Sequence, residues 1–244
     1  PFMDIDVFPN SVEYWGPNGM VFFRNVQLRW TPWQKGDSRF AIALERPGAS
    51  GDQGIYSDRI EVQNIKGRFP LPDFSGSYKY AQKWGYVRAA GMLRAIRWDD
   101  VLEDQYDLSG DATGWGLNLS SNLNLGKSDV LRFQYVFGEG IQNYMNDSPV
   151  DVGIVNDLAN PVTPIRGETI PIQGLVLFLD HTWSEKFSSS VGYSRQDNDN
   201  TEAQAANAVR SRHICEMVDF GQLDTGAFYV VMDLLEGPSL TRAL

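Results

Sequence analysis

The chain has 244 residues, and 21 Lys and Arg against 31 Asp and Glu give a formal net charge of −10. This acidic balance argues against general affinity for nucleic acid, which requires a basic surface that neutralises phosphates. The single cysteine, Cys215, excludes an internal disulfide, and the absence of any run of about 18 apolar residues excludes a membrane-spanning helix. Pro1-Phe2-Met3 carry no signal-peptide pattern, so we expect either a leader that was removed or a fragment of a longer sequence.

Alternating apolar and polar residues, the pattern of a strand with one apolar face, extend from Val21 to about Gln196. Short turns divide this region into four predicted antiparallel hairpins: 21–32 with 37–46, 73–82 with 84–97, 115–125 with 129–138, and 172–183 with 187–196. In the third hairpin, we expect Leu117, Leu119, Phe133 and Tyr135 on the apolar face and Asn118, Asn122, Arg132 and Gln134 on the polar face. The sequence therefore predicts eight long strands.

The connections between these strands alternate strictly in length. Turns within hairpins have one to four residues, whereas the connections between hairpins, 47–72, 98–113 and 139–171, are long and polar. Trp33, Trp84 and Trp183 all lie beside short turns, as in the aromatic girdle of a membrane interface. These features favour an all-β fold, namely an antiparallel up-and-down transmembrane β-barrel that is partial here, with about eight strands. The alternative is a soluble β-sandwich that acts as a binding module.

The polar face of the predicted strands carries more cations than anions. The residues expected to line a pore and contact anions are Arg29, Arg39, Lys79, Arg88, Arg94 and Arg132, with Glu45 as an acid among them. Arginine and lysine side chains in a channel raise the local concentration of anions and can bind carboxylates. Arg88 and Arg94 would lie roughly 20 Å apart on one strand and act as successive steps for an anion. The alternative is that these cations only neutralise acidic loop residues that fold inward.

Three stretches resemble the DcaP-like porins: FMDIDVFPNSVEYWGPNGMVFFRNVQLRWTPW (2–33), YAQKWGYVRAAGMLRAIRWDD (80–100) and DHTWSEKFSSSVGYS (180–194). The resemblance covers about residues 1–200 and implies a trimeric outer-membrane diffusion channel of Gram-negative bacteria for small anionic solutes such as dicarboxylates. Members of that family have about twice as many strands as predicted here, so strands before Phe2 and after Gln196 would be missing. The implied partners are small anionic solutes, outer-membrane lipid and, for a complete barrel, further copies in a homotrimer.

Residues 201–244 have a different pattern and are predicted to form a small α+β appendage to the porin-like part, 1–200. The Ala-rich run 202–209 predicts a helix, and 228–232 is apolar on both faces, which does not suit a barrel strand. EAQAANAVRSRHI (202–214) and CEMVDFGQLDTGAFYVVMDLLEG (215–237) resemble the small lobe of bacterial Ser/Thr protein kinases. By that resemblance, Glu202 would pair with the ATP-orienting lysine, Met232 would be the gatekeeper, and Asp233 to Leu235 would be the adenine-contacting hinge.

The kinase-like part lacks the Gly-rich loop, the strand lysine, the catalytic loop and the metal-binding DFG motif, so we expect an ATP-site remnant without catalytic activity. Such a segment is cytoplasmic in its own family. An artificial or misassembled join near residues 197–202 would account for this combination. The alternative is a divergent porin whose last segments merely resemble a kinase.

No motif for an enzyme, a cofactor or a metal ion stands out. His181 has no second histidine near it and His213 lies in the tail, so a histidine-based metal or catalytic site is not expected. The acidic residues within 99–100 and 147–157 are expected to be solvated. The sequence therefore predicts passive passage of small anions through the bacterial outer membrane, with no enzymatic activity and no cofactor.

Overall fold

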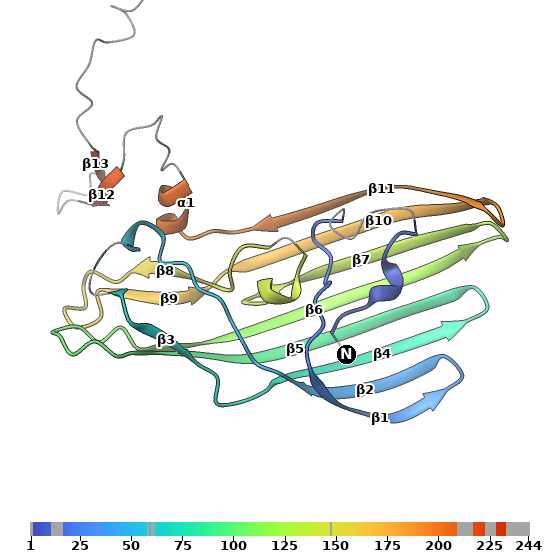
Figure 1. Ribbon diagram of the computed structural model, residues 1–244, viewed down its shortest axis with the longest axis horizontal. Helices are drawn as coiled ribbons and strands as arrows, with labels where there is room; N and C mark the ends of the chain where they lie inside the picture. Colours follow the sequence, from blue (N-terminus) through green and yellow to red (C-terminus); the bar gives the residue numbers. More distant parts are fainter. Residues whose placement is uncertain are drawn as a thin grey trace, which may run out of the picture.

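A computed structural model describes residues 2–10, 17–57, 59, 62–146, 148–208, 217–222 and 228–232. Its main feature is one antiparallel sheet of long strands (Figure 1). In spatial order, the sheet contains β1 (Gln27–Lys35), β2 (Ser38–Glu45), β4 (Asp73–Gln82), β5 (Gly85–Asp100), β6 (Gly110–Leu125), β7 (Asp129–Glu139), β10 (Pro171–Ser184) and β11 (Phe187–Asn198). The short strand β3 (Ile65–Arg68) pairs with β5 beyond the end of β4. Because β1 and β11 are the two ends of this order, the sheet is a curved wall whose closure into a barrel is not formed within the described residues.

Neighbouring strands pair as the four predicted hairpins, which confirms the all-β, up-and-down arrangement. The first hairpin differs in its bounds, since β1 begins at Gln27 rather than near Val21 and continues to Lys35. A register shift between Trp30 and Trp33 accommodates Pro32, which has no N–H to donate to the ladder. The turn then begins at Gly36, whose φ of 58° is accessible to glycine at no steric cost.

The connections between hairpins are more structured than the sequence predicted. β5 and β6 extend the second and third hairpins, so the expected loop 98–113 is reduced to 101–109. The connection after β7 holds the short 3-10 helix η4 (Gln142–Tyr144) and a separate hairpin of β8 (Val152–Asn156) with β9 (Ile165–Thr169). The connection after β2 holds η2 (Gly54–Tyr56). Elements this short are difficult to predict because a periodic pattern needs several residues to become visible.

The two faces of the sheet have opposite compositions, as predicted. Leu117 and Leu119 on β6 are 44% and 45% exposed, whereas Asn118 between them is fully buried. Gln134 on β7 is also fully buried, and Arg132 and Asn122 bond to the backbone of a segment that lies on the same inner side. Water-soluble domains show the reverse, with leucine inside and asparagine outside. The predicted orientation of the third hairpin is therefore confirmed.

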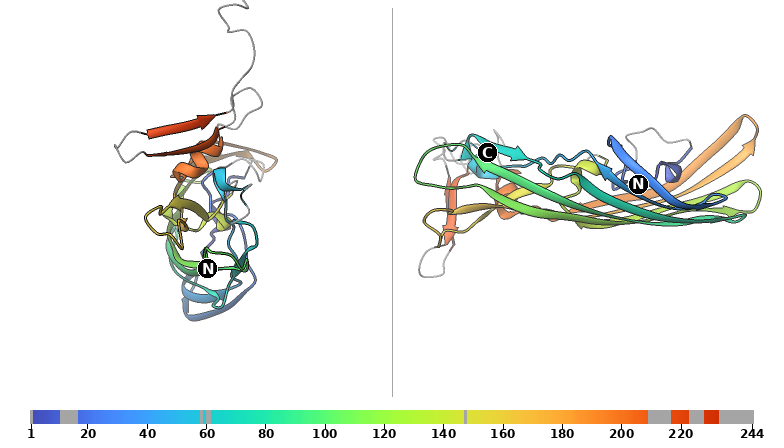
Figure 2. Two further views of the ribbon diagram at one scale, coloured as in Figure 1. Left: turned by 90° about the vertical axis from the view of Figure 1, so that its left-hand side faces the viewer. Right: turned by 90° about the horizontal axis from the view of Figure 1, so that it is seen from below.

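The concave inner face is covered by segments from elsewhere in the chain (Figure 2). One runs from Phe2 to Phe22, with residues 11–16 outside the described part, and contains η1 (Ile5–Val7); the other is 141–146 with η4. Two clusters of buried residues join these segments to the sheet: Phe2, Val21, Ala90, Met92, Val136, Ile141, Tyr144, Met145 and Ile172, and Val7, Met20, Val176 and Phe178. The inner face therefore has apolar patches among its polar residues, which the prediction of a wet face did not include.

Three elements follow the sheet: α1 (Glu202–Ala208), β12 (Met217–Gln222) and β13 (Phe228–Met232). β12 and β13 pair with each other in a separate two-stranded sheet, which confirms the prediction of a helix and two paired strands outside the main ladder. Ala203 of α1 is buried in a third cluster with Tyr56, Val62, Leu108 and Ile165. The division of the chain at residue 200 stays a prediction. Within the described part of the chain, no helix has the length and apolar character needed to cross a membrane.

Candidate functional site

The candidate site is the inner face of the sheet, where the register aligns three cations from adjacent strands. Arg39 on β2 lies opposite Lys79 on β4, and Lys79 lies opposite Arg88 on β5. All three stand at the alternate positions of their strands that face inward, so their side chains point to the same side of the sheet. We call this set the basic row. It continues across β6 and β7 through Ser120 and Gln134.

The basic row meets two aspartates of residues 2–8, which we call the acidic segment. Lys79 Nζ lies 3.1 Å from Asp6 Oδ2 and 3.7 Å from the centroid of the Tyr86 ring. Arg88 Nη1 lies 3.9 Å from Asp4 Oδ2, and both side chains are almost fully buried. Asp4 also accepts hydrogen bonds from Tyr86, at 3.0 Å, and from Ser120. Two of the three cations therefore have carboxylate partners that fold in from outside the sheet.

Arg29 and Arg39 lie at the β1 side of the inner face. Arg29 is opposite Ala43, a buried residue of the inner face, and its side chain is exposed, while Arg39 is half-buried. Neither arginine forms an ion pair with another of the described residues. These two positions keep the positive charge that the sequence predicted for an anion path.

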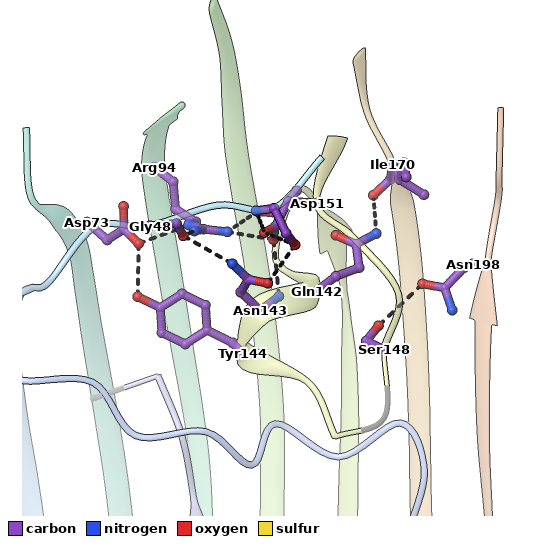
Figure 3. A network of polar contacts seen from close by, with 12 residues as sticks. Gly48, Asp73, Arg94, Gln142, Asn143, Tyr144, Ser148, Asp151, Ile170 and Asn198 are labelled. Atoms are coloured by element: carbon purple, nitrogen blue, oxygen red, sulfur yellow. Dashed lines mark hydrogen bonds and ion pairs between the residues drawn. The ribbon is translucent and has the colours of Figure 1, made fainter. Parts of the chain in front are cut away.

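Arg94 on β5 forms the most connected polar network of the inner face (Figure 3). Its Nε lies 2.9 Å from Asp73 Oδ2 and its Nη1 lies 2.8 Å from Asp151 Oδ1, and all three side chains are at most 2% exposed. Its guanidinium group also donates to the backbone carbonyls of Gly48 and Gly140. Since Gly48 and Asp151 belong to two different connections, Arg94 ties both of them to the sheet.

Tyr144 supports this network from η4. Its hydroxyl donates to Asp73 Oδ2 at 2.9 Å, and its ring centroid is 5.2 Å from the Arg94 guanidinium carbon. Burial, together with the nearby carboxylates of Asp73 and Glu45, raises the pKa of Tyr144 well above its ordinary value. The phenol therefore stays protonated and remains a hydrogen-bond donor. Glu45, the acid predicted on this face, is buried and accepts from Ser75.

Arg132 on β7 joins the other end of the acidic segment to β10. It forms an ion pair with Asp180, donates to the Asp6 carbonyl, and lies 2.9 Å from Asn10 Oδ1. Asp180 also accepts from Ser190 of β11. Arg132 is therefore neutralised on the wall itself, by a residue of a neighbouring strand.

The structure brings all six predicted pore-lining cations to one face, and it pairs Lys79, Arg88, Arg94 and Arg132 with acids. The alternative that these cations neutralise acidic residues folding inward is observed for Lys79, Arg88 and Arg94, although sequence reasoning did not name the acids. Asp73 and Asp180 lie on strands at inner positions, so the alternation could have found them. Asp4, Asp6 and Asp151 lie in segments without a periodic pattern, and nothing in the sequence predicts their direction. The expectation that the acidic residues within 147–157 are solvated is wrong for Asp151, which is fully buried because it neutralises Arg94. Contact of the six cations with solutes stays a prediction.

Other candidate residues lie away from the inner face. Glu202 is exposed on α1 and Met232 is the last residue of β13, while Asp233 and Leu235 lie outside the described residues. The kinase-like interpretation of the tail stays a prediction. Within the described part of the chain, no group of three or more His, Cys, Asp or Glu side chains is placed to hold a metal ion. His181 Nδ1 lies 2.7 Å from Asp129 Oδ1, at the turn end of the third and fourth hairpins.

The sheet has long antiparallel strands with an apolar outer face and a polar inner face, and these features are typical of the walls of antiparallel β-barrels. Among solved structures, the chain is similar to the outer membrane channel DcaP of Acinetobacter baumannii, with a TM-score of 0.64 and 15% sequence identity over 88% of this chain and 55% of that chain. This likeness shows the fold, and the chain spans about half the length of that channel. No protein-family model and no curated protein matches the chain.

Proposed function

We propose that this chain forms part of the wall of an outer-membrane channel through which small anionic solutes diffuse passively. The observation that carries the proposal is the inverted distribution of side chains on β6, where Leu117 and Leu119 are exposed and Asn118 is buried. An outer face of this kind suits a hydrocarbon environment, because burying apolar side chains away from water is favourable and leaving them exposed to water is not. A soluble β-sandwich would instead cover that face with a second sheet.

The preference for anions is supported by the charge on the inner face. Arg29 and Arg39 have no acidic partner among the described residues, so an oxyanion that reaches the β1 side of the sheet meets guanidinium groups with free donors. Guanidinium groups bind carboxylates and phosphates with two parallel hydrogen bonds. We include dicarboxylates among the expected solutes, and assembly as a homotrimer in outer-membrane lipid, on the strength of the resemblance to the DcaP-like porins.

The test is reconstitution of the full chain into planar lipid bilayers with a KCl gradient. We expect conductance with a reversal potential that indicates anion preference. Replacing both free cations, Arg29→Gln with Arg39→Gln, should lower this preference, and more so at low salt where screening is weak. The matched control, Lys127→Gln with Lys186→Gln, removes two cations from short turns and should leave it unchanged. Failure to insert would overturn the membrane assignment, and conductance without anion preference would overturn the choice of solute.

A further inference from the structure

The acidic segment and the inner wall exchange hydrogen bonds in one direction. The wall supplies the donors, which are the side chains of Tyr86, Arg88, Asn118, Ser120, Asn122, Arg132 and Lys79. The segment supplies the acceptors, which are the carboxylates of Asp4 and Asp6 and the carbonyl oxygens of Phe2 and Asp6. The segment is therefore bound to the wall as an oxyanion-bearing ligand would be bound.

The two carboxylates fill different sites on this donor surface. Asp4 is buried between Tyr86, Ser120 and Arg88, and its side chain is 6% exposed. Asp6 pairs with Lys79 and keeps half of its side chain in contact with solvent. A buried cation such as Arg88 loses its hydration free energy, and this loss is large unless an anion lies beside it. The site that Asp4 fills therefore favours an anion whether or not the segment provides it.

Apolar contacts at both ends hold the segment in register with these sites. Phe2 is fully buried, and its ring lies 6.0 Å from that of Tyr144 in an edge-to-face arrangement. Val7 is fully buried beside Met20 and Val176. Between these anchors, η1 is a single 3-10 turn, and Asp4 makes no capping bond to it. The carboxylate of Asp4 is thus used for the wall and contributes nothing to the internal structure of the segment.

We infer that the acidic segment is an autoinhibitory insert, a tethered carboxylate ligand of the inner wall that free oxyanions displace. Its two carboxylates occupy two of the three cations of the basic row, Lys79 and Arg88, which a permeating anion would otherwise meet. The inference concerns the inner face invoked in the proposed function and rests on it for its biological meaning. The binding and release of the segment can nevertheless be measured without any passage of solute.

Ala90 provides a reporter for release, because it is 4% exposed on the inner face of β5 and belongs to the same buried cluster as Phe2. In a chain with Cys215→Ser, the variant Ala90→Cys places one thiol beneath the acidic segment. We expect N-ethylmaleimide to label this thiol slowly in low salt. Sodium sulfate should accelerate labelling more than sodium chloride at equal ionic strength, since a divalent oxyanion competes for the donors while chloride mainly screens.

Removal of the carboxylates should have the same effect as sulfate. Adding Asp4→Asn and Asp6→Asn should raise the labelling rate by about 10-fold, because hydrogen bonds to ionised groups are stronger than those between neutral groups. The control with the same change of net charge, Asp37→Asn with Asp111→Asn, removes two exposed carboxylates and should leave the rate unchanged. A rate that responds neither to sulfate nor to loss of Asp4 and Asp6 would overturn the inference.

A second thiol position separates local release from general unfolding. Val62 is 1% exposed in the cluster that contains Ala203, away from the acidic segment. Val62→Cys should stay protected under every condition that exposes the thiol at position 90. Equal acceleration at both positions would mean that the chain unfolds, which would also overturn the inference. Release of the segment in a chain that gives no conductance would leave its displacement by oxyanions standing, but would overturn the proposed function and with it the autoinhibitory role.

Discussion

Arg94 Nη1 and Asp151 Oδ1 lie 2.8 Å apart in a position where both side chains are at most 1% exposed. This ion pair connects strand β5 with the connection between β7 and β10. Asp151 also accepts hydrogen bonds from the backbone N–H groups of Ser50 and Asn143. One carboxylate therefore fixes two connections and one strand relative to each other.

Asp151→Asn should destabilise the chain substantially. The substitution removes one of the two carboxylates that neutralise Arg94, and breaking a buried ion pair typically costs about 3–5 kcal/mol. Asp73 still partners Arg94, so we expect a loss near the lower end, about 3 kcal/mol, in the free energy of unfolding by urea in detergent. Asp197→Asn breaks an exposed pair with Arg195 and is the control. Equal effects of the two substitutions would contradict the role assigned to Asp151.

Leu119→Arg should reduce association with membranes. Leu119 is 45% exposed on the outer face, and an arginine on the lipid side of a barrel costs about 2–4 kcal/mol near the middle of the bilayer. The measurement is flotation of the refolded chain with lipid vesicles. Leu158→Arg, at a loop leucine that is 68% exposed, is the matched control and should float like the unmodified chain. If both variants float equally well, the outer face of β6 does not contact lipid.

Gly174→Ala should detach the segment that contains Gly19 from the sheet. A Cβ at position 174 would lie 2.1 Å from the Gly19 carbonyl oxygen, and backbone cannot move aside as a flexible side chain can. We expect a lower melting temperature, as for other overpacked sites, which lose about 1–3 kcal/mol. Gly76→Ala is the control, because its Cβ would meet only ordinary contacts at 3.7 Å. A melting temperature unchanged by Gly174→Ala would show that the two backbones are not in contact.

Tyr144→Phe should change the dependence of stability on pH. Because burial raises the pKa of Tyr144 above its ordinary 10.0, the folded state holds the phenol proton after the unfolded state has lost it. The contribution is complete below about pH 10 and is lost as the pH rises above it. The free energy of unfolding should therefore fall less steeply above pH 10 in the variant than in the unmodified chain. Parallel curves would place the alkaline dependence on other groups.

The sequence was sufficient to predict those parts of the fold that depend on local alternation. Leu117 and Asn118 occupy their predicted faces because successive side chains of a strand point to opposite faces of the sheet. The same rule places Arg88 and Arg94, six residues apart, on one face. Alternation along the strands could not predict which residues pair with these cations. The contacts of Asp4 with Ser120 and of Asp151 with Arg94 join residues 116 and 57 positions apart, and the segments that carry the aspartates have no periodicity. Their position is decided by burial and charge on the assembled wall.

The arrangement of β3 and β4 along one edge of β5 has a mechanical consequence for the wall. The β4 ladder ends at the pair Phe74–Leu93, and the β3 ladder begins at the pair Arg68–Arg97, so residues 94–96 have no strand partner on that edge within the described residues. The wall therefore has a seam at this level, where main-chain hydrogen bonds no longer hold neighbouring segments together. Arg94 and Asp73 lie at this seam, and their ion pair connects β5 with β4 there through side chains in place of main-chain hydrogen bonds.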